Sequence, residues 1–489
     1  MRDYSFGNYI SALRERRGLS QFQLGALVGK SDKAVSKWEN GVSKPRIGTI
    51  KKLSEVLDIS VDDLLTCEYD AFDRKRKDLF TMKKEIINKA KNRMKELYGD
   101  NSPISIENRF KQEELMLNDQ DVLLWMDFFG KLQEQCDEKN MFFGFRDAKI
   151  GASFIAWLLN DMNVNPLPAH YYCPICKKVE FVPDVSCGLD LSNKQCSCGA
   201  YYRKDGFGID AINMYPLSKH QDIFIYNQAI EVVKNCLCEF FEGYGEVREI
   251  RLKLDETGMK FDKAGTIKRF GIISRNANSR LPDETVEFSM DEYLELFDER
   301  LVLTMVECKD ENLNSWDVRN AEFTEYQLKA YCNYALEKGV FNDPGHGNNL
   351  ENLVANIVQP KFSDMLDVFG LLYGLGTWNE NDDNQYEDGI SISKMMSCSE
   401  NVYTYLYNKL NGKCCDNPSG KVFEITDNLR NGHYWRTGMP AEIETLLLEC
   451  DVPKWYVERI KKIRNLSRKA HTITIVKHNI CKFLKENHM

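Results

Sequence analysis

The N-terminal part of the chain spaces its apolar residues for two short helices joined by a tight turn. Within residues 20–41, Leu24, Leu27 and Val28 recur at helical spacing and predict a buried stripe on the first helix. Ser20 precedes this stripe, where its hydroxyl could cap the helix. Gly29 follows it and predicts the end of the helix, because glycine enters the left-handed region without strain.

The second helix of this segment has an apolar side and a polar side. Ser31 is placed to cap it, and Val35 and Trp38 are expected to face inward. The positions expected to face solvent are Asp32, Lys33, Ser36 and Lys37. This pattern predicts a helix-turn-helix whose second helix enters the major groove by its N-terminal end. The alternative is a plain helical bundle that makes protein contacts.

Residues 6–65 resemble the Cro/repressor-like (XRE) helix-turn-helix class. Phe6–Arg17 supplies a first helix that ends at Gly18, and Trp38-Glu39-Asn40-Gly41 with Lys44-Pro45 looks like the class's motif after the recognition helix. The remaining positions of the implied five-helix core are Ile50, Leu53, Leu57, Ile59, Leu64 and Leu65. The DNA-binding candidates are Gln21, Asp32, Lys33, Ser36, Lys37, Lys44 and Arg46.

The rest of the chain alternates helical and strand-like patterns. Helices are expected over 78–98, through most of 105–160 and over most of 320–489, whereas 246–254, 267–273 and 301–306 read as strands. The core candidates in 105–160 are Leu115, Leu117, Val122, Leu123, Trp125, Phe128 and Leu132. The prediction is a multidomain chain with an all-α head and a mostly helical α+β body. The expected parts are a head at 1–66, a helical linker at 67–100, a mixed region at 101–319 with a cysteine-rich insert at 170–206, and a helical region at 320–489.

Charge divides the chain unevenly between head and body. The 489 residues carry a net charge of −9, but residues 1–66 hold 11 Lys and Arg against 8 Asp and Glu. A mildly basic head on an acidic body favours DNA contact by the head. The run Arg74-Lys75-Arg76-Lys77 could touch phosphates, or it could be a solvated helix start.

The sequence predicts neither a membrane span nor a secretion signal. No apolar run is long enough to predict a membrane span, and residues 1–10 lack the apolar core of a signal peptide. Sixteen cysteines without such a signal favour reduced thiols in a cytoplasm. We therefore expect a cytoplasmic protein of a bacterium, a phage or a mobile element, associated with the nucleoid.

Four cysteines have the spacing of a metal site. Cys173 and Cys176 form a Cys-x-x-Cys pair, and Cys196 and Cys198 form a Cys-x-Cys pair that begins 20 residues after Cys176. Four thiolates can surround a structural zinc ion and leave no open position for a substrate. Cys187 is a spare candidate ligand. The alternative is a set of unmetallated thiols.

The surroundings of this cluster resemble PolC-type DNA polymerase III. Residues 165–177 and 198–206 look like the zinc-containing part of that family, and 144–154 look like its Gly/Ser-rich loop. Residues 360–378 and 451–471 look like its helical fingers. The resemblance implies a polymerase palm and fingers over residues 90–485. The family's exonuclease and phosphoesterase-like domains have no counterpart here.

The resemblance fails at the catalytic acids. The family places an Asp-x-Asp on a strand after the zinc insert to hold two metal ions. Here the matching stretch contains Asp222, but Phe224 stands where the second acid is expected. A third acid would fall at 304–307, near Met305, with Glu307 or Asp310 as unusual substitutes. The body is therefore expected to be a degenerate, non-catalytic polymerase-like region, with Mg²⁺ required only if it is active.

The nucleotide-binding residues implied by the resemblance are also altered. The family's glycine- and serine-rich run is interrupted here by Asp147. Arg146, Lys149 and Ser153 could still hold an anion, and Lys469 and His471 match the fingers segment. The bland alternative for Lys469 and His471 is a helix surface that meets no nucleotide.

Three functions remain open from the sequence. The first is a non-catalytic DNA-binding regulator, whose body dimerises, senses a ligand or contacts replication proteins. The second is a working nucleotidyltransferase that uses Asp222. The third is a polymerase mimic that binds primer–template DNA or replisome subunits. The first accounts best for the head, the lost acid and the acidic body.

Overall fold

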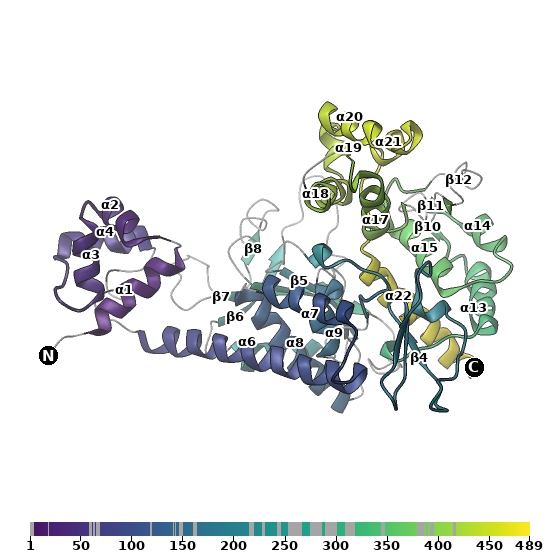
Figure 1. Cartoon of the computed structure of the whole chain (residues 1–489), viewed down its shortest axis with the longest axis horizontal. Coiled ribbons are helices and arrows are strands. Elements are labelled where there is room, and N and C mark those ends of the chain that lie inside the picture. Colours follow the sequence, from purple (N-terminus) through teal and green to yellow (C-terminus); the bar gives the residue numbers. More distant parts are fainter. Residues whose placement is uncertain are drawn as a thin grey trace. The chain divides into compact units, whose positions relative to one another are not determined.

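The chain is helix-rich and multidomain (Figure 1). The computed structural model describes residues 4–17, 19–57, 61, 64, 69–117, 120–139, 141, 143–145, 150–159, 164–214, 220–226, 230–241, 246–252, 267–273, 286–288, 301–308, 318–343, 348–378, 386–387, 390–391, 396–413 and 417–489. It divides into two compact units, of which the first is mainly Met1–Glu85 and the second holds most of the remaining chain.

The first unit is a bundle of short helices. They are α1 (Tyr4–Arg16), α2 (Gln21–Val28), α3 (Asp32–Glu39) and α4 (Ile47–Leu57). Their core buries Phe6, Tyr9, Ile10, Leu13, Leu24, Val28, Val35, Trp38, Ile50, Leu53, Leu57 and Leu64. A fifth helix, with Ile59 and Leu65, was also predicted, but both residues lie outside the described part of the chain.

Local capping signals set the boundaries of α2 and α3. The Ser20 hydroxyl accepts a hydrogen bond from the Gln23 amide, and the Gln23 side chain returns one to the Ser20 amide. Gly29 ends α2 in the left-handed region at φ 71°. The Ser31 hydroxyl caps α3 by accepting from the Ala34 amide. All three boundary predictions are confirmed.

Two predicted core positions are wrong. Leu27 is 57% exposed, because it lies on the outer side of α2 while Leu24 and Val28 face inward. Leu115 is 75% exposed on α7. The other predicted core residues of 105–160 are buried, namely Leu117, Val122, Leu123, Trp125, Phe128 and Leu132. Helical spacing alone did not show that the buried side of each helix is too narrow to include these leucines.

Helices lead from the predicted linker into the second unit. They are α6 (Tyr69–Tyr98), α7 (Ile104–Met116), α8 (Gln120–Glu138), α9 (Phe154–Leu158) and α10 (Ile230–Phe241). Aromatic residues join α8 to α10: Trp125 stacks on Phe129 at 5.6 Å and meets Phe241 edge-on at 5.7 Å. Short 3₁₀ turns lie at η1 (Ile150–Ala152), η2 (Gly188–Asp190) and η3 (Ala211–Met214).

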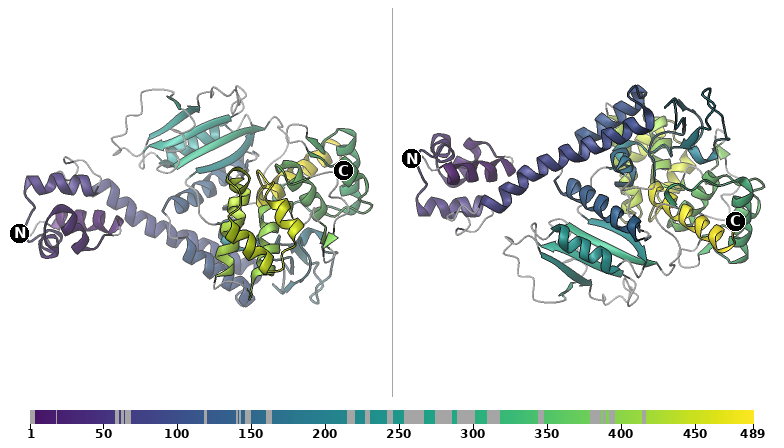
Figure 2. Two further views of the ribbon diagram at one scale, coloured as in Figure 1. Left: turned by 90° about the horizontal axis from the view of Figure 1, so that it is seen from above. Right: turned by 90° about the horizontal axis from the view of Figure 1, so that it is seen from below.

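A six-stranded mixed sheet forms the β part of the second unit (Figure 2). Its order is β1 (Phe143–Phe145), β5 (His220–Tyr226), β9 (Leu301–Cys308), β7 (Ile267–Ile273), β6 (Glu246–Leu252) and β8 (Val286–Phe288). β5 and β9 are parallel, whereas β7 is antiparallel to both of its neighbours. The three strands predicted from sequence are therefore confirmed. α10 packs on β6 and on α8.

A separate three-stranded sheet carries the cysteine-rich insert. β2 (His170–Tyr172) lies between β3 (Val179–Phe181) and β4 (Arg203–Asp205), antiparallel to both. Its own core is small and consists of Tyr171, Cys173, Leu191, Cys196 and Tyr202.

The C-terminal part is mostly helical, as predicted. Its helices are α13 (Glu325–Glu337), α14 (Glu351–Ala355), α15 (Phe362–Tyr373), α17 (Ser399–Leu410), α18 (Pro418–Arg430), α19 (His433–Thr437), α20 (Ala441–Glu449), α21 (Lys454–Ile460) and α22 (Lys469–Glu486). Two hairpins, β10 (Asn342–Asp343) with β11 (Asn348–Asn349) and β12 (Tyr386–Glu387) with β13 (Ile390–Ser391), interrupt them. Among the described residues, no helix combines the length and the apolar content needed to cross a membrane.

Candidate nucleic-acid interface and metal-ligand cluster

The outer side of α3 presents a small group of polar residues. Asp32, Lys33 and Lys37 are exposed, while Val35 and Trp38 are buried beneath them. Neither lysine forms an ion pair within the described part of the chain. Two cationic side chains without an acidic partner therefore stand on the helix that was predicted to face DNA.

A buried ion pair fixes α3 against α1. Arg14 Nε lies 2.6 Å from Glu39 Oε1, and Arg14 Nη2 lies 3.0 Å from Glu39 Oε2. The hydrogen bond to Glu39 raises the pKa of Arg14 above its usual value. The sequence pattern does not predict this pair, because its members lie 25 positions apart and belong to different helices.

Gln21 belongs to the same network. Its Nε2 donates to Glu39 Oε2 at 2.7 Å, so α2 is tied to α3 through the carboxylate that α1 also contacts. Gln21 is half-buried. It was predicted as a DNA contact, but the structure shows that its amide nitrogen is already committed to Glu39.

Three further DNA-binding candidates flank or line α3. Ser36 is half-buried, and its hydroxyl and carbonyl oxygens both accept hydrogen bonds from Asn40 Nδ2. Lys44 Nζ lies 5.8 Å from the centre of the Phe6 ring. Arg46 is exposed just before α4 and forms no side-chain ion pair among the described residues.

The four predicted cysteine ligands converge on one point. The sulfur atoms of Cys173, Cys176, Cys196 and Cys198 all lie within 4.8 Å of one another. Sulfur–sulfur distances of 3.4 Å join Cys173 to Cys198 and Cys176 to Cys196. Backbone turns with positive φ at Lys177 and Gly199 bring each pair together. The cluster could therefore hold a metal ion.

Backbone amides near the cluster lower the pKa of two of its thiols, Cys173 and Cys196, whereas neighbouring thiols raise that of Cys176 to about 12. The Cys176 amide points at Cys173 Sγ at 3.4 Å, and the Cys198 amide lowers the pKa of Cys196 to about 6. Cys187, the spare candidate, is not part of the cluster. It is fully buried elsewhere in the insert, and burial raises the pKa of its thiol. The prediction of Cys187 as a ligand is therefore wrong.

A buried polar network anchors the insert to the end of α6. The Tyr98 hydroxyl lies 3.1 Å from His170 Nε2 and accepts from Asn165 Nδ2 at 3.2 Å. Asn165 Nδ2 also donates to Asp205 Oδ2, and His170 Nδ1 lies 2.7 Å from the Pro168 carbonyl oxygen. Burial lowers the pKa of His170 and raises that of Tyr98. Both groups are therefore kept neutral.

The register of β5 and β9 places the predicted palm residues. Asp222 is paired with Thr304, Phe224 with Val306 and Ile225 with Glu307. Positions alternate between the two faces of a strand, and paired positions share a face. Glu307 therefore occupies the face opposite Asp222, and so does the Met305 position. Asp310 lies outside the described residues.

The Ser153 position is already filled by a carboxylate of the chain itself. Ser153 is fully buried, and its hydroxyl donates to Glu113 Oε2 at 2.9 Å. The Phe154 and Ile155 amides donate to the same carboxylate, and Arg109 Nε lies 2.5 Å from its Oε1. The structure thus corrects the assignment of Ser153 to a nucleotide.

Arg109 extends this hydrogen-bond network around Glu113. Its guanidinium also donates to the carbonyl oxygens of Ala152, at 2.6 Å, and Ile209, at 2.7 Å. The other two candidates from this loop, Arg146 and Lys149, lie outside the described residues.

Lys469 is also committed within the fold. It is buried at the start of α22, and its Nζ donates to the Phe207 carbonyl oxygen at 2.6 Å. Its amide donates to Glu400 Oε2. A buried ammonium held in this way is not a helix-surface cation. The alternative that Lys469 lies on an exposed helix surface is therefore wrong. His471 is half-buried, and its proposed contact with a nucleotide stays a prediction.

Comparison with known proteins finds similarity for both parts of the chain. Residues 10–64 match the family described as Helix-turn-helix. This part of the chain is an XRE-type helix-turn-helix domain. The buried Arg14–Glu39 pair and the exposed side of α3 therefore belong to a helix-turn-helix domain.

The remainder is similar to PolC-type DNA polymerase III. About 80% of the chain aligns with the protein of Clostridium perfringens at 25% identity, and also with that of Thermotoga maritima at 25% identity. The protein of Ureaplasma parvum is 23% identical over 78% of the chain. The chain spans about a third of the length of these relatives, covering 31% to 33% of them. We refer to this part as the PolC-like region.

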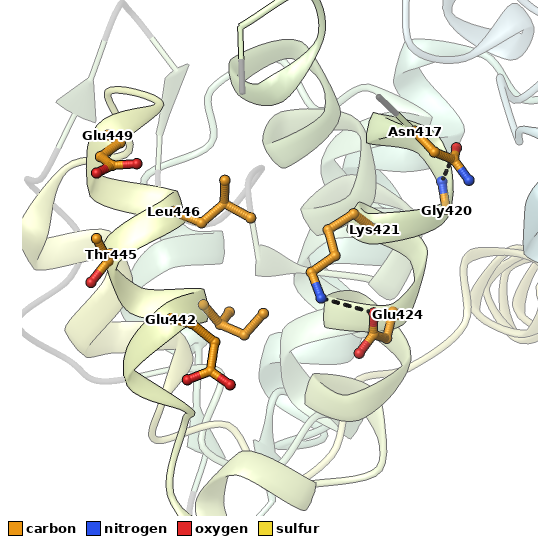
Figure 3. A pocket seen from close by; sticks show the side chains of 9 residues that line it. Asn417, Gly420, Lys421, Glu424, Glu442, Thr445, Leu446 and Glu449 are labelled. Carbon is orange, nitrogen blue, oxygen red and sulfur yellow. Dashed lines mark hydrogen bonds and ion pairs between the residues drawn. The ribbon is translucent and has the colours of Figure 1, made fainter. Parts of the chain in front are cut away.

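The PolC-like region has an acidic groove between α18 and α20 (Figure 3). Its volume is about 860 Å³. Lys421 and Leu446 extend into it from opposite helices. Three glutamates line it, Glu424, Glu442 and Glu449, and only Glu424 pairs with Lys421 at 3.0 Å. Its excess negative charge disfavours a phosphate backbone.

Proposed function

We propose that this protein is a sequence-specific, duplex-DNA-binding regulator of transcription. The observation that supports this proposal is the pair of exposed lysines on α3, Lys33 and Lys37, which form no ion pair within the described residues. The buried side of the same helix packs into the core of the domain. Arg14, Glu39 and Trp38 hold that helix in place. A rigid helix with free cations at its outer side is what major-groove reading requires.

Each DNA-binding candidate of the domain then has a role. Lys33 and Lys37 contact guanine edges or phosphates, and Ser36 bonds a base or the backbone. Asp32 accepts from a cytosine amino group or favours the helix N-terminus by its charge. Lys44 and Arg46 position the DNA backbone. Gln21 donates its amide nitrogen to Glu39, so only its carbonyl oxygen remains to accept a hydrogen bond from a base.

We further propose that the PolC-like region is non-catalytic. A phenyl ring cannot bind Mg²⁺, so Phe224 leaves Asp222 without its expected partner. The positions on β9 that share a face with Asp222 are Val302, Thr304, Val306 and Cys308, and none has a carboxylate. In this proposal residues 101–319 are a degenerate palm, 67–100 a helical linker and 320–489 a fingers-like region.

The cysteine cluster is proposed to be a structural zinc site. Its four sulfur donors match the ligand set of structural zinc sites, because four thiolates fill the tetrahedral positions and leave none open for a substrate. Zinc bound by Cys173, Cys176, Cys196 and Cys198 would hold the three-stranded insert closed, because its apolar core is small.

The partners follow from these assignments. Duplex DNA is the partner of the helix-turn-helix domain, and a homodimer would match a palindromic site. The acidic groove between α18 and α20 favours a basic protein segment over bare DNA, which supports contact with replication proteins as a second role. The resemblance to bacterial relatives favours a cytoplasmic, nucleoid-associated protein of a bacterium or its phage.

A binding competition at fixed salt tests the main proposal. Full-length protein is offered duplex DNA from upstream of its own gene, a random duplex and a primer–template junction. Salt is held constant because phosphate contacts make affinity steeply salt-dependent. We expect the upstream duplex to be preferred.

Two double variants decide which residues read the DNA. Lys33→Ala with Lys37→Ala should abolish the preference, because each specific base contact is worth about 1–3 kcal/mol. Lys51→Ala with Lys52→Ala removes the same charge from the exposed side of α4 and should keep it. An unchanged preference in the first variant contradicts the proposal, as does a preference for the junction.

A further inference from the structure

An exposed tryptophan and an arginine stack on one another in the C-terminal part of the PolC-like region. Trp435 lies on α19 (Figure 1) and is 49% exposed. The guanidinium carbon of Arg464 lies 4.8 Å from the centre of the Trp435 ring system. Arg464 covers part of the indole, and about half of the residue remains open to solvent. An aromatic surface of this size is usually buried in a folded protein.

Backbone contacts hold the two residues in place. At Gly432, just before α19, an added Cβ would lie 2.2 Å from the Arg464 carbonyl oxygen, so α19 begins in direct contact with the 464 backbone. The Leu466 amide donates to the Arg430 carbonyl, and the Arg464 amide donates to the Leu375 carbonyl at 2.8 Å. The Trp435–Arg464 pair therefore rests on two fixed segments.

The charge around this pair is not neutralised. Arg436 and Lys462 are exposed in the same two segments. Within the described part of the chain, Arg436, Lys462 and Arg464 form no ion pair. The neighbouring Lys461, in contrast, pairs with Glu444 at 2.7 Å and Glu458 at 3.0 Å. Three cations without an ion pair thus lie in the two segments that carry the open indole, in a chain with a net charge of −9.

We propose that this surface binds single-stranded nucleic acid. A base stacks on the open part of Trp435, and the backbone phosphates are held by Arg436, Lys462 and Arg464. Aromatic stacking combined with cations is how proteins bind single strands without reading sequence. A duplex hides the faces of its bases inside the stack, so this surface discriminates against it. The site is separate from the helix-turn-helix domain and does not depend on its function.

The test measures binding of labelled oligo(dT) to the full-length chain by fluorescence anisotropy. The protein carries Lys33→Ala and Lys37→Ala, so that the helix-turn-helix domain contributes little. Trp435→Ala should weaken binding by roughly 5- to 150-fold, which corresponds to the loss of one stacked base. Trp435→Phe should retain most of the affinity. Arg464→Ala should lower the salt dependence by about 0.7 per lost phosphate contact.

Matched controls remove similar groups elsewhere in the same region. Tyr326→Ala deletes an aromatic residue that is 75% exposed on α13, and Lys454→Ala deletes an exposed cation at the start of α21. Both should bind oligo(dT) as the parent does. The proposal is overturned if the parent binds no single strand, if it binds a duplex of equal length as tightly, or if Trp435→Ala behaves like Tyr326→Ala.

Discussion

The Arg14–Glu39 ion pair is the residue-scale feature on which the helix-turn-helix domain depends. Both side chains are nearly buried, with 11% and 6% of their surface exposed. Glu39→Ala would leave the guanidinium without its buried anion and would release the Gln21 side chain as well. We expect it to lower the stability of the domain by about 3 kcal/mol. Hydrogen exchange of α2 and α3 amides should then accelerate on the order of 100-fold.

Glu15→Ala is the control for this prediction. Glu15 also lies 3.4 Å from Arg14, but 59% of its side chain is exposed. Surface pairs of this kind contribute about 0–1 kcal/mol. Equal acceleration in the two variants would show that the burial of Glu39 is not what matters.

His170 gives the insert a pH dependence. Because burial holds its folded-state pKa below the unfolded value, the unfolded chain binds the extra proton first. His170 therefore contributes stability above pH of about 6.5, and that contribution is lost as the pH falls, at no more than about 1.4 kcal/mol per pH unit. The check is to measure the free energy of unfolding of the wild type and of His170→Gln over the range of about pH 5 to about pH 8.

Comparing the wild type with His170→Gln separates the effect of His170 on stability from that of the cysteine thiolates in the same insert. Glutamine can still accept the Tyr98 hydrogen bond but gains no proton. The variant should therefore lose stability less steeply on acidification. Identical slopes would assign the acid sensitivity to other groups.

At the scale of elements, close packing of α1 on α3 sets the position of the recognition helix. A Cβ at Gly7 would lie 2.4 Å from the carbonyl oxygens of both Trp38 and Glu39. These are backbone atoms at the end of α3 and cannot move without shifting the helix. Gly7→Ala should destabilise the domain by about 1–3 kcal/mol and weaken binding to its duplex site.

Gly48→Ala is the same change in α4 with the opposite expected sign. No atom lies within 4 Å of a Cβ at that position. Alanine should stabilise the helix there by about 0.5–1 kcal/mol. Urea unfolding and duplex affinity of both variants decide the point, and equal effects would refute the packing argument.

The cysteine-rich insert should depend on its metal. We expect about one zinc ion per chain by elemental analysis. Cys176→Ser should abolish this zinc and open the insert to proteolysis, since its apolar core is small. Cys187→Ala should keep the full zinc content. Zinc retained by Cys176→Ser, or lost from Cys187→Ala, would contradict the ligand set.

At the scale of the whole molecule, we expect no polymerase activity. Primer extension with Mg²⁺ or Mn²⁺ should yield no product, with a PolC-type enzyme as the positive control. Phe224→Asp alone should not restore it, because no carboxylate of β9 shares the face of Asp222. Extension by the wild type that disappears in Asp222→Ala would make the protein a nucleotidyltransferase.

Local signals explain what the sequence predicted well. Capping at Ser20 and Ser31, the strands of the sheet and the convergence of four cysteines depend on neighbours close in the chain or on regular spacing. The errors have the opposite origin. Gln21 is held by Glu39, and Ser153 by Glu113, through partners 18 and 40 positions away. Leu27 and Leu115 show that a helix's apolar side depends on what packs against it.

The hydrogen-bond network of Arg109 and Glu113 has a consequence for synthesis of the chain on the ribosome. It joins α7 to α9, yet one hydrogen bond of Arg109 reaches Ile209, 100 positions downstream. At about 5–20 residues per second, Ile209 follows Leu159 by roughly 3–10 s. During that interval Arg109 can pair with Glu113, but its hydrogen bond to Ile209 cannot form, so completion of this buried network waits for residue 209.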